Sequence, residues 1–324
     1  MAAVNDGRVT AAPLPSPDGR LHLTDGGLET VLIFHDGLDL PEFAAFPLVD
    51  TPDGRARLER YYDEYVALAQ HHGTGVVLET PTWRASRDWG AVLGYDAAAL
   101  ARVNAEAVAL VRRVVEARAG EGRGSAEAGM LVSGCVGPRG DGYLVEDAMS
   151  AADAADYHFP QVAALHAAGA DLVSALTITS SAEAAGIVLA ARQVGAPVVI
   201  SFTVEVDGRL PSGEGLAEAI GAVDEATVAA AAYFMVNCAH PVHVAPALDG
   251  GDAALRRLRG LRANASTLSH TELDAADELD DGDPVDLGER LAVLIATHPQ
   301  LSVVGGCCGT DARHVAAIAA ACSR

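Results

Sequence analysis

The sequence contains no lysine, because all 22 of its basic residues are arginine. This absence excludes enzymes that depend on a lysine amine, such as Schiff-base aldolases, pyridoxal enzymes and P-loop nucleotide hydrolases. The basic residues are also outnumbered by 44 acidic residues, which gives a formal net charge of −22. Phosphate backbones are bound by clustered cations, so we expect no nucleic-acid partner.

Long uncharged apolar runs are also missing. No stretch of about 18 apolar residues occurs, so we expect no membrane span. The first 16 residues lack the basic and apolar regions of a secretory signal, so we expect a cytoplasmic protein. In a reducing compartment the five cysteines are better candidates for metal binding or catalysis than for disulfides. Because half of the 324 residues are apolar, the chain can bury a sizeable core.

Short β-branched runs alternate with stretches of helical periodicity along nearly the whole chain. Strict alternation predicts a parallel sheet with right-handed crossovers, and eight such units close most economically into a single-domain (β/α)8 TIM barrel over residues 21–324. An open, doubly wound sheet is the alternative. The predicted strands are 21–24, 75–79, 130–135, 171–177, 198–204, 233–237, 261–265 and 301–305, and the predicted helices are 54–72, 97–117, 151–168, 182–194, 214–231, 242–258, 285–297 and 311–321.

Three segments depart from this alternation. Residues 1–20 are rich in proline and small residues, which predicts a flexible N-terminal tail. Residues 119–128 are expected to form a flexible loop before the third strand. The acidic stretch 272–283 is expected to be solvated surface, because blocks of like charge usually are.

The strongest chemical signal is the adjacent pair Cys307 and Cys308, which follows the eighth predicted strand between glycines. Cys238 follows the sixth predicted strand. In a barrel the carboxyl ends of all strands lie on one rim, so the three thiols can converge there. Three sulfur ligands and one open position describe a catalytic zinc site, which predicts Zn²⁺ as the cofactor.

Other interpretations of the cysteines remain open at this stage. The adjacent pair can form a redox-active or strained disulfide, and Cys238 alone can be a small buried hydrophobe. We assign Cys135 and Cys322 to packing. The two histidines of the pattern CAHPVH, His240 and His243, are expected to form a polar turn that opens a helix rather than to bind metal.

Two weaker motifs lie at the ends of the first and second predicted strands. In DGGLET, the N–H groups of Gly26 and Gly27 can bind a carboxylate, and Asp25 can orient a metal ligand or an amine. In LETPTWRAS, four residues are expected on the rim. They are Glu79, Thr80, Trp83 and Arg84.

Together, DGGLET, SGCVGPRGD, VVISFTV, MVNCAHP and VVGGCCGTD resemble the zinc-dependent homocysteine S-methyltransferase family, which includes betaine–homocysteine methyltransferase. The resemblance spans about residues 21–322, and its specific part is Asn237-Cys238 combined with Gly-Gly-Cys-Cys. It implies that Cys238, Cys307 and Cys308 bind zinc. It also implies that Asp25 and Gly26 lie beside the metal and under the acceptor's carboxylate, and that Thr80 lies near the acceptor.

The sequence departs from the family at the acceptor site. Relatives hold the amino group of homocysteine with a glutamate at the end of the fourth strand, where this chain has Leu176. Glu183 is expected to point elsewhere, whereas Glu79 can replace the lost contact. Phe43 stands in the tryptophan position of the relatives, and Trp83 with Arg84 replaces their aromatic or Tyr-Gln pair.

These features predict an S-methyltransferase that moves a methyl group from a sulfonium or quaternary ammonium donor to a zinc-bound thiolate. Homocysteine is the leading acceptor and an S-methylmethionine-like donor is favoured. Aromatic side chains, among them Trp83, Phe43 and Tyr143, suit a cationic donor, and Arg84 can bind a donor carboxylate. The alternatives are another thiol acceptor, a zinc hydrolase and a non-catalytic metal- or thiol-binding barrel. A homo-oligomer is possible.

Overall fold

The computed structural model describes residues 20–119, 129–143, 149–249, 251–276 and 278–323. The predicted tail over 1–20 and the predicted loop over 119–128 therefore lie outside the described residues, apart from Arg20 and Ala119. Within the described ranges, none of the helices combines the length and the apolar character that a membrane crossing requires.

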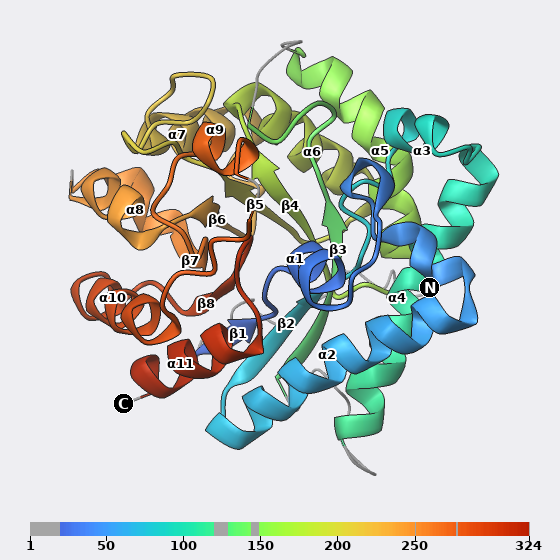
Figure 1. Cartoon of the computed structure of the whole chain (residues 1–324). Helices are drawn as coiled ribbons and strands as arrows, with labels where there is room; N and C mark the ends of the chain where they lie inside the picture. The colour runs from blue at the N-terminus through green and yellow to red at the C-terminus, as the bar shows by residue number, and fades with distance from the viewer. Residues whose placement is uncertain (1–19, 120–128, 144–148, 250, 277, 324) are drawn as a thin grey trace, which may run out of the picture.

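Eight parallel strands pair in chain order and close into a barrel, which confirms the predicted (β/α)8 fold (Figure 1). The ring closes where β1 pairs with β8. The strands are β1 His22–Thr24, β2 Gly75–Glu79, β3 Met130–Val136, β4 Leu172–Ile178, β5 Val198–Phe202, β6 Tyr233–Ala239, β7 Leu258–Ala263 and β8 Val303–Gly306.

Helices surround the strands, and short helices sit in the loops that follow β1, β2 and β7 (Figure 1). The surrounding helices are α2 Pro52–His72, α4 Ala97–Ala119, α5 Ala151–Ala167, α6 Ser181–Val194, α7 Leu216–Thr227, α8 Pro241–Leu248, α10 Pro284–Thr297 and α11 Ala312–Cys322. The short helices are α1 Leu28–Thr30, which continues into a π-helix over Val31–His35, α3 Arg87–Val92 and α9 His270–Asp274.

The barrel interior changes from apolar to polar along the strands. The part nearer the amino ends of the strands is a separate cluster of buried residues, Val77, Leu131, Leu172, Val199, Tyr233, Met235 and Val303. Because alternate residues of a strand share a face, the positions two residues further along four of these strands also point inward. Those positions hold Glu79, Ser133, Ser174 and Ser201, all buried.

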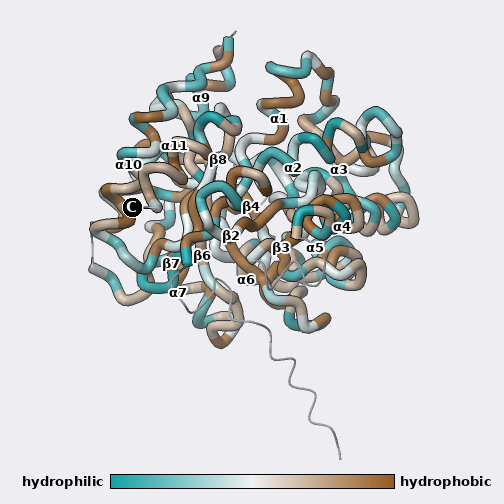
Figure 2. The backbone as a smooth tube through the Cα atoms, turned by 90° about the horizontal axis from the view of Figure 1, so that it is seen from below, coloured by the Kyte–Doolittle hydropathy of each residue, from teal (hydrophilic) through white to brown (hydrophobic). Residues whose placement is uncertain are grey.

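The larger apolar core lies between the sheet and the helices. In Figure 2 the hydrophobic colour runs along the strands at the centre of the molecule. The apolar layers therefore hold the barrel together, while the polar layer marks the end of the barrel at which chemistry is possible.

The largest error in the predicted boundaries lies between β6 and β7. The helix predicted over 242–258 ends at Leu248, and β7 begins at Leu258, three positions before the predicted start. The chain turns at Gly251, whose φ of +64° lies in the left-handed region that glycine tolerates, and Asp252 caps a short 3-10 helix, Ala253–Arg257. Arg262 lies in the strand that was predicted over 261–265, and it points into the barrel, where it pairs with a carboxylate.

Candidate metal centre and substrate pocket

Cys238 reaches the cavity because β6 contains a bulge. In the pairing of β6 with β7, Asn237 lies opposite Arg262 and Ala239 lies opposite Ala263, so Cys238 is an extra residue. Its φ of +56° is in the left-handed region, which is rare outside glycine. Bulges of this kind re-aim a side chain. The predicted strand end at residue 237 therefore falls at the bulge itself.

Cys307 and Cys308 follow β8 directly, and their turn ends at Gly309, which has a φ of +76°. The Sγ atoms of Cys238 and Cys307 are 2.8 Å apart, and those of Cys238 and Cys308 are 3.2 Å apart. All three Sγ atoms lie within 4.8 Å of one another. The predicted convergence of three thiols distant in the sequence is therefore present, and all are free cysteines.

The cluster is suited to a soft divalent cation. The thiols of Cys238 and Cys308 stabilise a thiolate on Cys307 and hold the pKa of Cys307 well below its ordinary value. A hydrogen bond to Cys307 raises the pKa of Cys238, hydrogen bonds to Cys238 and Cys307 raise that of Cys308, and burial adds to both rises. Three buried thiols this close together cannot all lose their protons unless a cation compensates the negative charge. Zinc binds such a set of thiolates, so these residues fit Zn²⁺.

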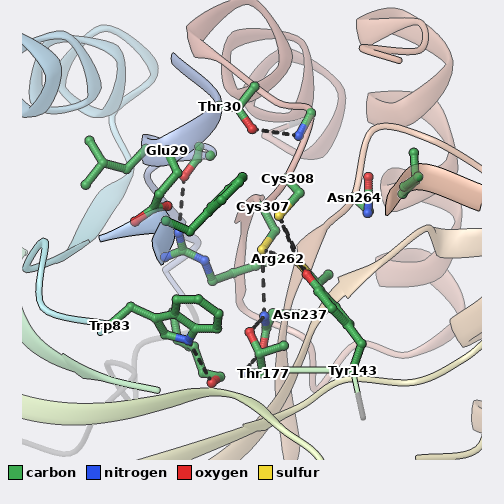
Figure 3. Close-up of a pocket in the computed structure, with 18 of the residues that line it drawn as sticks. Glu29, Thr30, Trp83, Tyr143, Thr177, Asn237, Arg262, Asn264, Cys307 and Cys308 are labelled. Carbon is green, nitrogen blue, oxygen red and sulfur yellow. Dashed lines mark hydrogen bonds between the residues drawn. The ribbon is translucent and has the colours of Figure 1, made fainter. Parts of the chain in front are cut away.

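Polar contacts hold the cluster in place from two sides. The Asn237 side chain accepts from the Thr177 N–H at 2.7 Å, donates to the Thr177 hydroxyl at 2.8 Å and donates to Cys307 Sγ at 3.7 Å (Figure 3). Thr177 has a φ of +62° beside a bulge in β4. Asn237 therefore links the irregular end of β6 to the irregular end of β4. It lines the cavity, but its amide is occupied by these contacts.

His270 and Tyr143 complete the enclosure of the sulfur atoms. Nε2 of His270 lies 2.8 Å from the Cys238 carbonyl, and Nδ1 lies 3.0 Å from Glu205. The Tyr143 ring packs on His270, with centroids 4.0 Å apart, and its hydroxyl donates to Cys238 Sγ at 3.3 Å. The sequence singled out Tyr143 only as an aromatic wall, and it did not identify His270.

Arg262 was not identified from the sequence, although it is the central cation of the site. It is buried on β7, and its Nη2 lies 2.7 Å from Asp25 Oδ1, while Nη1 lies 3.9 Å from Glu79 Oε1. Asp25 is therefore paired with a guanidinium. Burial raises the pKa of Asp25, and the attraction to Arg262 opposes this rise.

Glu79 stands at the boundary between the polar layer and the cavity. Burial raises its pKa to about 7, against the opposing attraction of Arg262. Its Oε2 atom is buried without a hydrogen-bond partner, and so are Nε and Nη1 of Arg262. Because buried polar atoms are normally satisfied, these three atoms indicate a place where a polar ligand group binds.

The glycines of the first motif line the cavity, but their backbone groups are partly occupied. The Gly27 N–H donates to the carbonyl and to the hydroxyl of Thr310, at 3.0 and 3.1 Å. The Gly26 carbonyl accepts from Tyr61 at 2.9 Å. The Gly27 N–H, which was expected to bind a carboxylate, is therefore already hydrogen-bonded within the protein. The sequence could not show this, because Thr310 lies near the other end of the chain.

The Thr80 hydroxyl is also used within the protein. It lies 2.7 Å from the Thr82 hydroxyl and accepts from the Cys135 N–H at 2.9 Å. Cys135 is buried on β3, and Cys322 is packed against the core. His240 caps α8 by accepting from the Val242 N–H, as the predicted polar turn requires.

Trp83, Arg84 and Phe43 line the outer part of the cavity. The Trp83 indole donates to the Leu176 carbonyl at 3.2 Å, and the Arg84 guanidinium stacks on its ring. Phe43 is 48% exposed and has a φ of +58°, so it stands at the mouth rather than against the cysteines. Leu176 lines the cavity where relatives have a carboxylate. Glu183 points elsewhere, since its Oε1 lies 2.9 Å from His158 Nε2.

The cavity has a volume of about 570 Å³, and its lining is acidic and aromatic. Among the described residues, eight carboxylates line it against two guanidiniums, those of Arg84 and Arg262. Most described residues of the stretch 272–283 are exposed, as predicted for solvated surface, and several of them also form the outer wall of the cavity. The carboxylates are Asp25, Glu29, Glu42, Glu79, Asp141, Asp274, Glu278 and Asp280.

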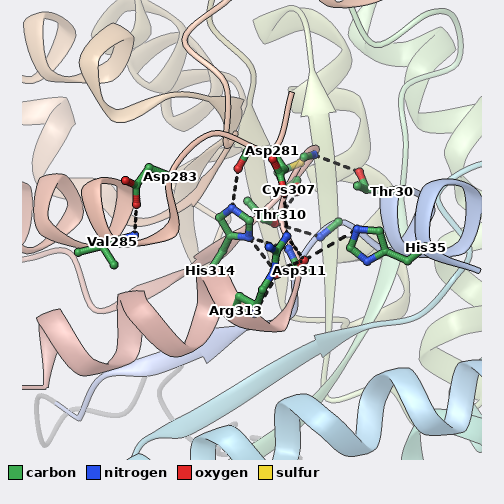
Figure 4. A network of polar contacts seen from close by, with 12 residues as sticks. Thr30, His35, Asp281, Asp283, Val285, Cys307, Thr310, Asp311, Arg313 and His314 are labelled. Carbon is green, nitrogen blue, oxygen red and sulfur yellow. Dashed lines mark hydrogen bonds and ion pairs between the residues drawn. The ribbon is translucent and has the colours of Figure 1, made fainter. Parts of the chain in front are cut away.

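A polar network around Asp311 ties the outer wall to α11 (Figure 4). Asp311 caps α11 and accepts from Arg313 Nε at 2.9 Å. Arg313 also donates to the Asp281 carboxylate at 2.8 Å, and His314 Nε2 lies 2.7 Å from the Asp281 carbonyl. From the other side, His35 Nε2 lies 3.9 Å from Asp311 Oδ2. The segments after β1 and β7 thus share one anchor.

Comparison with known proteins agrees with this architecture. Residues 22–322 match the sequence model of a family described as homocysteine S-methyltransferase. No curated protein was found to be similar in sequence. Crystal structures of the homocysteine methyltransferase MmuM from Escherichia coli share the fold. The metallated form has a TM-score of 0.71 and 22% identity, covering 93% of this chain and 96% of that chain. The oxidized form has a TM-score of 0.75 and 23% identity, covering 95% and 98%.

Proposed function

Since this chain belongs to the homocysteine S-methyltransferase family, we propose that it transfers a methyl group from a sulfonium or quaternary ammonium donor to an acceptor thiol. Homocysteine is the leading acceptor, which would make methionine the product, and an S-methylmethionine-like sulfonium is the favoured donor. The observation that carries this proposal is the convergence of Cys238, Cys307 and Cys308 at the floor of an acidic, aromatic cavity.

We propose that these three cysteines hold Zn²⁺. The donor set supports this, because thiolates are soft ligands and three of them leave room for one exogenous group. A metallated form of E. coli MmuM, which shares the fold, is consistent with a bound metal. When bound, zinc lowers the pKa of an acceptor thiol and so supplies sulfur as a thiolate near neutral pH.

The residues around the cluster would orient the acceptor. Glu79 offers the unpartnered Oε2 atom to the acceptor's ammonium group, which takes the place of the family glutamate lost at Leu176. Arg262 keeps Glu79 and Asp25 within reach of one guanidinium, so two buried carboxylates are held without full mutual repulsion. Asn237 holds Cys307 in place and is a positioning residue.

The composition of the cavity supports a cationic donor. Carboxylates outnumber guanidiniums eight to two, and Phe34, Phe43, Trp83, Trp89 and Tyr143 present aromatic rings. In the transfer, an electron pair of the acceptor sulfur forms the new bond to the methyl carbon. The bond between that carbon and the donor's sulfur or nitrogen breaks, and its electron pair stays on the donor, which leaves uncharged at that atom. The acceptor's thiol proton is released before the transfer.

The test combines metal analysis with an assay of methyl transfer. Purified protein loaded with Zn²⁺ is incubated with homocysteine and, separately, with S-methylmethionine, S-adenosylmethionine or betaine, and methionine is measured. We expect about one zinc per chain and the fastest turnover with S-methylmethionine. A zinc-loaded protein that methylates no thiol from any of these donors would refute the proposal, and hydrolytic turnover would favour a zinc hydrolase instead. The cytoplasmic location and a homo-oligomeric state stay predictions.

A further inference from the structure

Arg84, for which the sequence suggested a contact with a donor carboxylate, is a buried cation that the methyl-transfer step itself does not use. It is 8% exposed and lies between two indole rings, 4.2 Å from the Trp83 centroid and 3.8 Å from the Trp89 centroid. Its Nη1 atom donates to the Gly140 carbonyl at 3.0 Å. Its Nε atom is buried without any hydrogen-bond partner.

No carboxylate of the described ranges lies within ion-pair distance of this guanidinium. The neighbouring arginines differ in this respect, because Arg87 and Arg139 both pair with Asp88. Burial lowers the pKa of Arg84, and more distant carboxylates, Asp141 first, oppose this. A buried charge without a close partner is costly, so its persistence in a cavity wall indicates an anion that arrives from outside.

The stack restricts how an anion can approach. The guanidinium carbon lies over both indole rings, and Nη1 is held by the Gly140 carbonyl. The edge that contains Nε remains. An arginine edge offers two parallel N–H groups that match the two oxygens of a carboxylate, and stacking fixes the plane in advance.

The position of Arg84 relative to the cysteines favours the donor over the acceptor. Trp83 connects the two regions, because its ring contacts the Arg84 guanidinium while its indole N–H donates to the carbonyl of Leu176, which precedes Thr177. Thr177 in turn contacts Asn237, which contacts Cys307 (Figure 3). If the acceptor sulfur binds at the cysteines, the rest of this small molecule would contact Glu79 and Arg262. The donor would then occupy the outer part of the cavity, beside Trp83 and Trp89.

We propose that Arg84, clamped between Trp83 and Trp89, binds the carboxylate of the methyl donor, so that the enzyme selects zwitterionic donors that carry a carboxylate beside the cationic methyl group. This inference rests on the proposed methyl transfer. It explains why an otherwise acidic cavity keeps a second guanidinium. The acidic residues would attract the donor's cation, and Arg84 would set its orientation.

The first experiment needs no variant. Binding of S-methylmethionine to the zinc-loaded protein is measured by titration calorimetry and compared with its carboxamide, which keeps the sulfonium but removes the anion. The carboxamide carries one more positive charge, so the acidic lining alone would make it bind more tightly. We expect the carboxamide to bind about 30-fold more weakly, which corresponds to about 2 kcal/mol. Equal or tighter binding of the carboxamide, or no binding of either compound, would overturn the inference.

The second experiment uses Arg84→Met, which keeps a side chain long enough to fill the space between the indoles. We expect the KM for S-methylmethionine to rise about 30-fold, the KM for homocysteine to change little, and the preference over the carboxamide to disappear. Arg87→Met is the matched control, because Arg87 is on the same loop and its side chain is 64% exposed outside the cavity. A rise confined to the KM for homocysteine would mean that Arg84 serves the acceptor, and the inference would fall.

The two proposals fail in distinguishable ways. If the protein transfers methyl groups equally well from donors with and without a carboxylate, the proposed function stands and the role of Arg84 is refuted. If S-methylmethionine binds in a manner that depends on its carboxylate and on Arg84 but no thiol is methylated, the anion site stands and the proposed function is refuted.

Discussion

Replacing Glu79 by glutamine should make the folded protein more stable in weakly alkaline solution, although Glu79 lies in the proposed acceptor site. Burial raises the pKa of this carboxyl from an ordinary value of 4.5 to about 7, and Arg262 only partly compensates. A shift of about 2.5 units corresponds to about 3 kcal/mol. The side chain is 6% exposed, so solvent screening reduces this value little.

The sign follows from the raised pKa. Folding favours the protonated form of Glu79, so the cost of ionising it appears as the pH rises from about 4.5 to about 7 and is complete above that range. Glutamine has the same shape and cannot ionise. Glu79→Gln should therefore raise the free energy of unfolding by about 3 kcal/mol at pH 8 and by less than about 1 kcal/mol at pH 5.

The assay is thermal unfolding of both proteins at pH 5 and pH 8, in a metal chelator so that zinc contributes to neither. For a chain of 324 residues, about 3 kcal/mol corresponds to a rise of roughly 4 °C in Tm at pH 8. Glu116→Gln, which changes an exposed glutamate on α4, is the control and should show no such dependence on pH. An equal change at both pH values, or a less stable variant at pH 8, would show that attraction to Arg262 outweighs burial.

Three further substitutions test other parts of the structure. Cys307→Ala should abolish methyl transfer and reduce the zinc content. Its circular dichroism and Tm should stay near those of the metal-free protein, since the thiols lie on the rim and the apolar core lies elsewhere. An unfolded variant would mean that the metal is structural. Leu176→Glu should lower the KM for homocysteine several-fold by placing a second carboxylate in the cavity, and an unchanged preference among thiols would contradict this account of the acceptor site. Val228→Gly should stabilise the protein by about 1 kcal/mol, because this β-branched residue has a φ of +57° and is 85% exposed; a lower midpoint in denaturant would disprove that explanation.

The barrel and the convergence of the three cysteines could be predicted because their signals are local. Each βα unit contains its own apolar run and its own helical period, and the pair Cys307-Cys308 lies beside glycines that bend the chain. Cys238 could be placed on the same rim once the strands were counted. The bulge that aims its Sγ atom inward was not predictable, since it depends on hydrogen bonds between Asn237 and Thr177 across two strands.

The electrostatics of the site could not be predicted for the same reason. Arg262 lies in a predicted strand whose sequence gives no sign of a partner, and only the closed barrel brings it to Asp25. The Gly27 N–H was expected to be available to a ligand, but the barrel closure places Thr310 against it. Trp89 gives no signal until it stacks on Arg84. Residues whose partners are distant in the chain are therefore the ones that sequence reasoning misses.

The anchor at the start of α11 has a mechanical consequence. The Asp311 carboxylate lies 3.9 Å from His35, which belongs to the segment after β1. Arg313 and His314 are hydrogen-bonded to Asp281, which belongs to the segment after β7. The same helix begins four residues beyond Cys308, so the segments after β1 and β7 and two of the three sulfur atoms are attached to one helix end. A displacement of either segment would therefore be expected to act on the positions of Cys307 and Cys308 as well.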